Sequence, residues 1–226
     1  MEHLTRDFYL RQAYAIIDYM EYLFLIVILI FSVVIHEVAH GATANYLGDP
    51  TAKYAGRLTL NPIKHLDPIG SVILPLVLII MAQVTGGGII FGWAKPVPIN
   101  PFNFRDRKYG SAKVSLAGPG ANLAVALFFG LALRLIPFVS GIPGLVSIFS
   151  YIVYINILLA VFNLLPIPPL DGSHILFTFL PGEERIRAAL SQYGLFILLF
   201  VLFFFFPIIV AIVKIIFRLI VGGSFF

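Results

Sequence analysis

His36-Glu37-Val38-Ala39-His40 lies near the end of an apolar stretch, residues 22–47, in which Glu37 is the only carboxylate. Positions i and i+4 of a helix share one face, so both imidazoles can reach one metal ion. Two histidines at this spacing, with a glutamate between them, are typical of a zinc site whose glutamate acts on water. Charge at the centre of a membrane helix costs roughly 2.5–3.5 kcal/mol and usually marks function. The alternative is that the histidines only form hydrogen bonds between helices.

The composition predicts an all-α polytopic membrane protein. Of 226 residues, 60% are hydrophobic and 12% are charged, whereas a soluble domain is about 25% charged. With no cysteine, a metal has to be held by His, Asp or Glu, which indicates Zn²⁺ or a similar ion. The net charge of +4 comes without a basic run, so we expect no nucleic-acid partner, and no small-molecule cofactor is evident. We expect one membrane-embedded domain over residues 1–226, in contact with the lipid bilayer.

Apolar length and helix-breaking residues predict four spanning helices, at residues 22–47, 114–136, 145–165 and 194–217. Residues 3–20 predict a short interfacial helix or an irregular lead-in, and residues 182–192 predict a loop. Two strand-like runs, Gly56–Leu60 and Ile89–Val97, are candidate edges for binding an unwound substrate.

Residues 69–94 are interpreted as a re-entrant hairpin with short strand-like segments. A single crossing there would put the two most basic loops on opposite faces, whereas a hairpin keeps both on the cytoplasmic side. This reading predicts a multi-pass protein of the cell membrane with its active site towards the cytoplasmic side.

Asp171 is the best candidate for a third metal ligand. It follows Pro166-Ile167-Pro168-Pro169, where a helix has to unwind, and it is the only carboxylate besides Glu37 at plausible membrane depth. Two alternatives stay open: Asp171 could instead N-cap a helix at 173–180, and His174 could replace it as ligand. His65 is a further candidate, although a polar residue at the membrane interface is the simpler interpretation.

Glu37 fits the general base that takes a proton from the attacking water. Asn122 and Asn163 are amides inside predicted membrane helices, where either could hold a substrate backbone or stabilise an oxyanion. Both could equally be helix-packing groups. The small residues of Ala117–Ala121 indicate a close-packing surface.

Three motifs in this order resemble the site-2 protease family of intramembrane zinc metalloproteases, peptidase M50, in its compact prokaryotic branch. The motifs are HEVAH in one span, AGPGAN opening a later one, and FNLLPIPPLDG ending another. The resemblance implies one Zn²⁺ held by His36, His40 and Asp171, with Glu37 activating water and the substrate cleaved in its transmembrane segment. It also associates Asn122 and Asn163 with substrate handling.

The function predicted from these residues is that of an intramembrane zinc metalloendopeptidase acting on transmembrane protein substrates. Two alternatives from other classes are a membrane metal-ion transporter and a non-catalytic scaffold that keeps the fold. A transporter would need a second His/Asp relay across the bilayer, which the sequence does not suggest.

Overall fold

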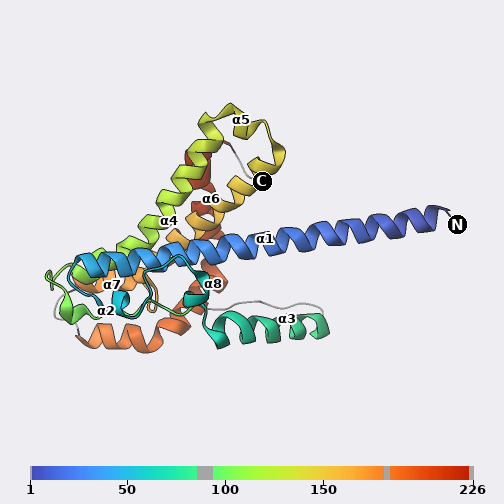
Figure 1. Cartoon of the computed structure of the whole chain (residues 1–226). Coiled ribbons are helices and arrows are strands. Elements are labelled where there is room, and N and C mark those ends of the chain that lie inside the picture. The colour runs from blue at the N-terminus through green and yellow to red at the C-terminus, as the bar shows by residue number, and fades with distance from the viewer. Residues whose placement is uncertain (1, 86–93, 181–183, 224–226) are drawn as a thin grey trace.

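The computed structural model describes residues 2–85, 94–180 and 184–223, and the described residues contain helices and no strands (Figure 1). In chain order the elements are α1 (Glu2–Tyr46), α2 (Thr51–Tyr54), η1 (Pro62–His65), η2 (Pro68–Ile73), α3 (Leu74–Thr85), η3 (Pro101–Asn103), α4 (Gly110–Leu135), α5 (Pro137–Ser140), α6 (Pro143–Asn163), α7 (Asp171–Phe179) and α8 (Glu184–Val221).

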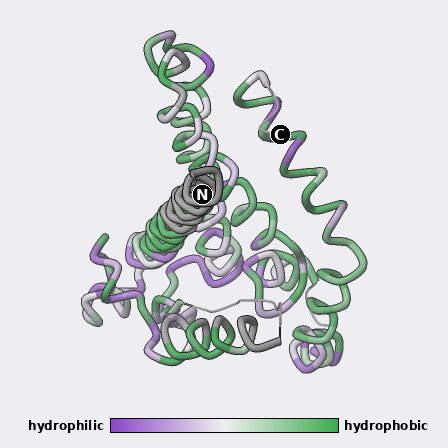
Figure 2. Tube along the Cα trace, turned by 90° about the vertical axis from the view of Figure 1, so that its right-hand side faces the viewer, coloured by the Kyte–Doolittle hydropathy of each residue, from purple (hydrophilic) through white to green (hydrophobic). Residues whose placement is uncertain are grey.

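Within the described ranges, four helices are long and apolar enough to cross a membrane: α1 from Leu23 onward, α4, α6 and α8. The protein is a multi-pass, all-α membrane protein. Figure 2 shows these helices as mostly hydrophobic, while hydrophilic segments gather in the loops. Large apolar side chains on the outside of the helices, such as Phe128 and Phe203, suit contact with lipid.

Helix α4 is the centre of the bundle, because it packs against α1, α6, α7 and α8. A buried cluster joins α4, α6 and α8 through five side chains: Ala126, Val153, Ile157, Val213 and Phe217. Ala44, Phe104 and Val114 form a second cluster, which fixes the end of α1 against the start of α4. The second cluster lies beside the HEVAH stretch and therefore holds the two helices that build the site.

Two helices extend beyond the predicted ranges. Helix α1 is continuous from Glu2, so the separate interfacial helix predicted at residues 3–20 is wrong. No proline interrupts residues 2–46, and nothing in the sequence ends the helix before the span begins. Helix α8 starts at Glu184, so most of the predicted loop at 182–192 is helical. Glu184 lies in its first turn, where an acidic side chain is favourable beside the helix dipole.

The strand-like run at Gly56–Leu60 forms a turn and bends instead of a strand. Its polar groups find local partners: the main-chain amide of Arg57 donates to the carbonyl of Ala52 (3.0 Å), and His65 Nε2 donates to that of Thr59 (2.9 Å). These two main-chain groups are thus paired without a neighbouring strand.

The predicted hairpin at 69–94 is described only in part. Its first leg is helical, as η2 and α3, and residues 86–93 lie outside the described residues, so the hairpin stays a prediction. The second strand-like run, Ile89–Val97, falls mostly in the same gap, and its last residues, 94–97, have no regular secondary structure.

The proline-rich segment ends helix α6, as predicted. Helix α6 stops at Asn163, residues 164–170 are irregular with a cis Pro168–Pro169 peptide, and α7 begins at Asp171. Gly172 lets α7 start against the end of α6, because a Cβ there would lie 2.3 Å from the carbonyl oxygen of Leu164. This close contact sets the position of Asp171.

Candidate metal centre

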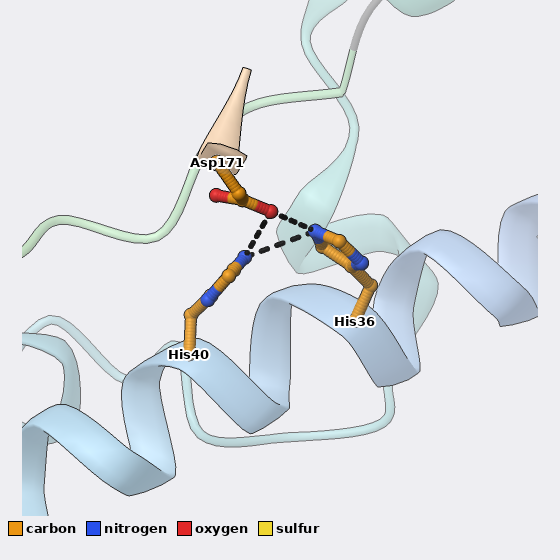
Figure 3. A group of neighbouring side chains, drawn as sticks. All are labelled: His36, His40 and Asp171. Atoms are coloured by element: carbon orange, nitrogen blue, oxygen red, sulfur yellow. Dashed lines mark hydrogen bonds and ion pairs between the residues drawn. The ribbon is translucent and has the colours of Figure 1, made fainter. Parts of the chain in front are cut away.

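His36, His40 and Asp171 come together although 135 residues separate His36 from Asp171 (Figure 3). Asp171 Oδ2 lies 3.0 Å from His36 Nε2 and 3.2 Å from His40 Nε2. The two Nε2 atoms are 2.9 Å apart. Both histidines are buried, and the carboxylate is mostly buried. Four ligands at about 2.0–2.1 Å around a tetrahedral zinc ion stand about 3.3 Å from one another, so this triangle has nearly the size that zinc requires.

The Nδ1 atoms of both histidines are hydrogen-bonded to groups on α4. His36 Nδ1 donates to Asn122 Oδ1 (2.6 Å), and His40 Nδ1 donates to the carbonyl of Val114 (2.7 Å). A neutral imidazole that donates from Nδ1 presents a lone pair at Nε2. The two Nε2 lone pairs and the carboxylate oxygen therefore converge, and a shared cation relieves their repulsion. The donor set fits Zn²⁺.

The orientation of the Asn122 amide is fixed by two hydrogen-bond acceptors, the carbonyl of Ser32 and the side-chain oxygen of Asn156. Asn122 Nδ2 donates to the carbonyl of Ser32 (3.1 Å) and to Asn156 Oδ1 (2.8 Å), so Oδ1 faces His36. Asn156 Nδ2 in turn donates to the carbonyl of Ile152 (2.8 Å) and to Ser32 Oγ (2.9 Å). A buried network across three helices thus selects the tautomer of His36.

Asn156 and Ser32 are site residues that the sequence analysis missed. Both are buried, and Asn156 is one of two amides in an apolar span, which was the available signal. Asn122 is fully buried, and its contacts indicate that it orients His36. They favour the packing alternative for this residue over a direct contact with substrate.

Gly118 of the AGPGAN stretch lies directly against the two histidines. A Cβ at Gly118 would lie 2.4 Å from His40 Nε2 and 2.6 Å from His36 Nε2. Only glycine lets α4 approach the histidine pair this closely. The space beside the two ligand nitrogens is thus kept open by one missing methyl group.

The remaining candidates lie apart from the three ligands. Asp171 is the first residue of α7 and Leu170 holds the N-cap position, so the alternative of Asp171 as N-cap of a helix at 173–180 is wrong. His174 is exposed and His65 is buried, and neither belongs to the group of metal-type side chains found in the described part of the chain. Asn163 donates to the carbonyl of Leu159 (2.9 Å) in its own helix.

Glu37 directly follows His36 in the chain and is partly buried. Its Oε2 accepts a hydrogen bond from the main-chain amide of Val97 (2.8 Å). The carboxylate is therefore held by a segment 60 residues away, which the sequence did not suggest. Buried histidines, a carboxylate from a second element and an adjacent held glutamate, inside an apolar helical bundle, are the features of a membrane-embedded metallohydrolase.

Comparison with known proteins leads to the same class. The profile of peptidase family M50 matches residues 139–201. The protein named "Putative zinc metalloprotease YwhC" of Bacillus subtilis is 40% identical over 187 residues, which cover 80% of each chain. The protein named "Putative zinc metalloprotease Rip2" of Mycolicibacterium smegmatis is 35% identical over 179 residues, which cover 76% of this chain and 63% of Rip2. No solved structure matches the chain.

The chain belongs to peptidase family M50, the site-2 protease family. It is an intramembrane zinc metalloprotease, as its motifs predicted. The comparisons lend no support to a metal-ion transporter or a non-catalytic scaffold.

Proposed function

We propose that this protein hydrolyses peptide bonds within or near the transmembrane segments of membrane proteins, at one zinc ion held by His36, His40 and Asp171. The observation that carries the proposal is the triangle of ligand atoms 2.9–3.2 Å apart, with an oxygen acceptor at Nδ1 of each histidine that leaves Nε2 for the metal. Zinc bound there would supply a Lewis acid and would lower the pKa of water towards 7.

Glu37 is proposed as the general base. The amide of Val97 donates to Oε2, and Oε1 is the oxygen that we propose takes the proton. The Asn122–Asn156 pair keeps His36 in place during this transfer, and neither amide needs to contact substrate. Asn163, at the end of α6 and partly exposed, is the remaining candidate for substrate handling, in line with the family resemblance.

The active site is proposed to face the cytoplasmic side. His40 lies six residues before the end of α1 at Tyr46, about 9 Å of helix rise. The loops that follow that end carry most of the basic residues, including Lys53, Arg105 and Lys108, and a basic excess marks cytoplasmic loops. We also propose that residues 1–226 form a single domain, because α4 contacts every other spanning helix.

Cleavage is tested with purified wild-type protein and Glu37→Gln in proteoliposomes that contain a model transmembrane substrate. Both proteins should bind one zinc ion, and only the wild type should release fragments, whose mass locates the cut. Asp171→Ala should lose zinc. Zinc-loaded wild type that leaves several unrelated transmembrane substrates intact would contradict the proposal.

Sidedness can be tested cleanly because the chain has no cysteine. Lys108→Cys lies in an exposed loop before α4, and Gly141→Cys lies in the exposed link between α5 and α6. In intact cells an impermeant maleimide should label Gly141→Cys and leave Lys108→Cys unlabelled until the membrane is opened. The reverse pattern would place the site on the outer side.

A further inference from the structure

The segment from residue 94 to residue 100, here called the strap, crosses the site without regular secondary structure. It is tied down near both ends. The amide of Lys95 donates to the carbonyl of His65 (2.9 Å), and the amide of Asn100 donates to Asp49 Oδ2 (2.7 Å). The strap is therefore a fixed part of the structure around α1.

One peptide group in the middle of the strap touches the proposed base. The amide of Val97 donates to Glu37 Oε2 (2.8 Å), and the Val97 side chain is buried. Pro96 and Pro98 have no N–H, so Val97 carries the only main-chain donor of the three residues. The prolines also restrict the backbone on either side to extended conformations. This donor is rigidly aimed.

The other end of the same peptide group is bound by Arg57. Its Nη2 donates to the carbonyl of Pro96 (3.2 Å) and to that of Lys95 (3.0 Å), and the side chain is buried. The Pro96 carbonyl and the Val97 amide are the two ends of one planar unit. A charged donor on the carbonyl both fixes that plane and polarises its N–H towards Glu37.

Gly41, directly after the HEVAH motif, makes the contact possible. A Cβ at Gly41 would lie 3.0 Å from Val97 Cγ1 and 2.7 Å from Leu58 Cδ2. The strap and the residue after Arg57 thus both pack on α1 one turn beyond Glu37. A larger residue at this position would lift the strap away from the base.

We propose that Arg57 is a positioning residue for catalysis, acting on Glu37 through the Pro96–Val97 peptide group. This inference rests on the proposed function, because it gives Glu37 the role of base. With Oε2 fixed by the strap, the carboxylate keeps one rotamer, and Oε1 stays directed to the proton it takes.

The kinetic test compares Val97→Pro, which removes the N–H, with Val97→Ala, which keeps it. Val97→Pro should lower kcat about 10- to 100-fold more than Val97→Ala does, the size expected for one hydrogen bond to a charged group. Zinc content should stay within about twofold of wild type in both variants, because the three proposed ligands are untouched, and kcat is determined separately from KM. Equal kcat values for the two variants would overturn the proposal.

Arg57 is tested in the same assay by a double-mutant cycle. Arg57→Ala should lower kcat by a similar factor in the wild-type background and by less than about threefold when Val97 is already proline. Arg57→Lys should restore part of the loss, since an ammonium group can still donate to a carbonyl. Losses that multiply in full would show that Arg57 acts independently of the strap.

Hydrogen exchange in the zinc-free protein tests the contact without activity. Glu37→Ala should speed exchange of the Val97 amide at least tenfold relative to that of Lys95, which serves as internal control because its acceptor is His65. Glu37→Gln keeps an acceptor and should retain most of the protection. If the ratio of the Val97 to the Lys95 exchange rate is unchanged in Glu37→Ala, the hydrogen bond between Val97 and Glu37 is refuted, even if the protein is an active protease. Conversely, an inactive wild type with the expected ratio would leave the contact intact and refute the function.

Discussion

Gly118→Ala should disable the metal site while leaving the helix that carries it intact. The added Cβ would lie 2.4 Å from His40 Nε2 and 2.6 Å from His36 Nε2, against an ordinary contact of about 3.5 Å. One or both nitrogens would have to retreat by about 1 Å. Zinc–ligand distances tolerate only about 0.2 Å, so the ion cannot keep both histidines. We expect zinc affinity to fall at least 100-fold.

The matched control is Gly120→Ala, two residues further along α4, where an added Cβ meets no atom within 4 Å. Alanine favours a helix over glycine by roughly 1 kcal/mol, so neither substitution should weaken α4 itself. Gly120→Ala should therefore bind zinc like the wild type and be at least as stable.

Zinc content by elemental analysis, zinc affinity by competition with a chelator, and helix content by circular dichroism distinguish the two variants. We expect Gly118→Ala to be folded and to lack stoichiometric zinc. If Gly118→Ala binds zinc as tightly as Gly120→Ala, the close approach of α4 to the histidines is wrong.

Three further predictions concern the network, the metal and acid stability. Asn156→Leu should lower zinc affinity about 10- to 100-fold by releasing Asn122 from its fixed orientation towards His36, and chelator competition would show no change if the network is irrelevant. Stripping zinc should lower the thermal midpoint, since an ion at 100 times its Kd contributes about 2.7 kcal/mol, and re-addition should restore it. Burial alone would raise the pKa of Asp49, but hydrogen bonds from Thr51, Asn100 and Asn103 outweigh it and hold that pKa below its usual value. The contribution of Asp49 to stability is therefore full above about pH 3.9 and is lost as the pH falls through the lowered pKa, so thermal melts of Asp49→Asn should be less acid-sensitive in that window.

Much of the helical framework could be predicted because apolar length and helix breakers act locally. Three prolines in Pro166–Pro169 end α6 whatever surrounds them, and residues 22–47 are too apolar to be anything but a span. The predictions that were wrong concern segments whose structure depends on a partner elsewhere in the chain or whose local sequence pattern is weak. A strand at Gly56–Leu60 needs a neighbouring strand, and here the Arg57 amide donates to the carbonyl of Ala52 while His65 donates to the carbonyl of Thr59.

His36, Glu37 and His40 were evident from the sequence because a helix by itself puts residues i and i+4 on one face. The chemistry proposed for them, and the family, followed from residue type and order. The tertiary structure alone decided how the ligands are aimed. Asn156 fixes Asn122, and both are remote from His36 in the chain, so no local pattern reports them. Gly118 and the strap also lie close to residues that are distant in the chain, and only the packing of the helices brings these segments together.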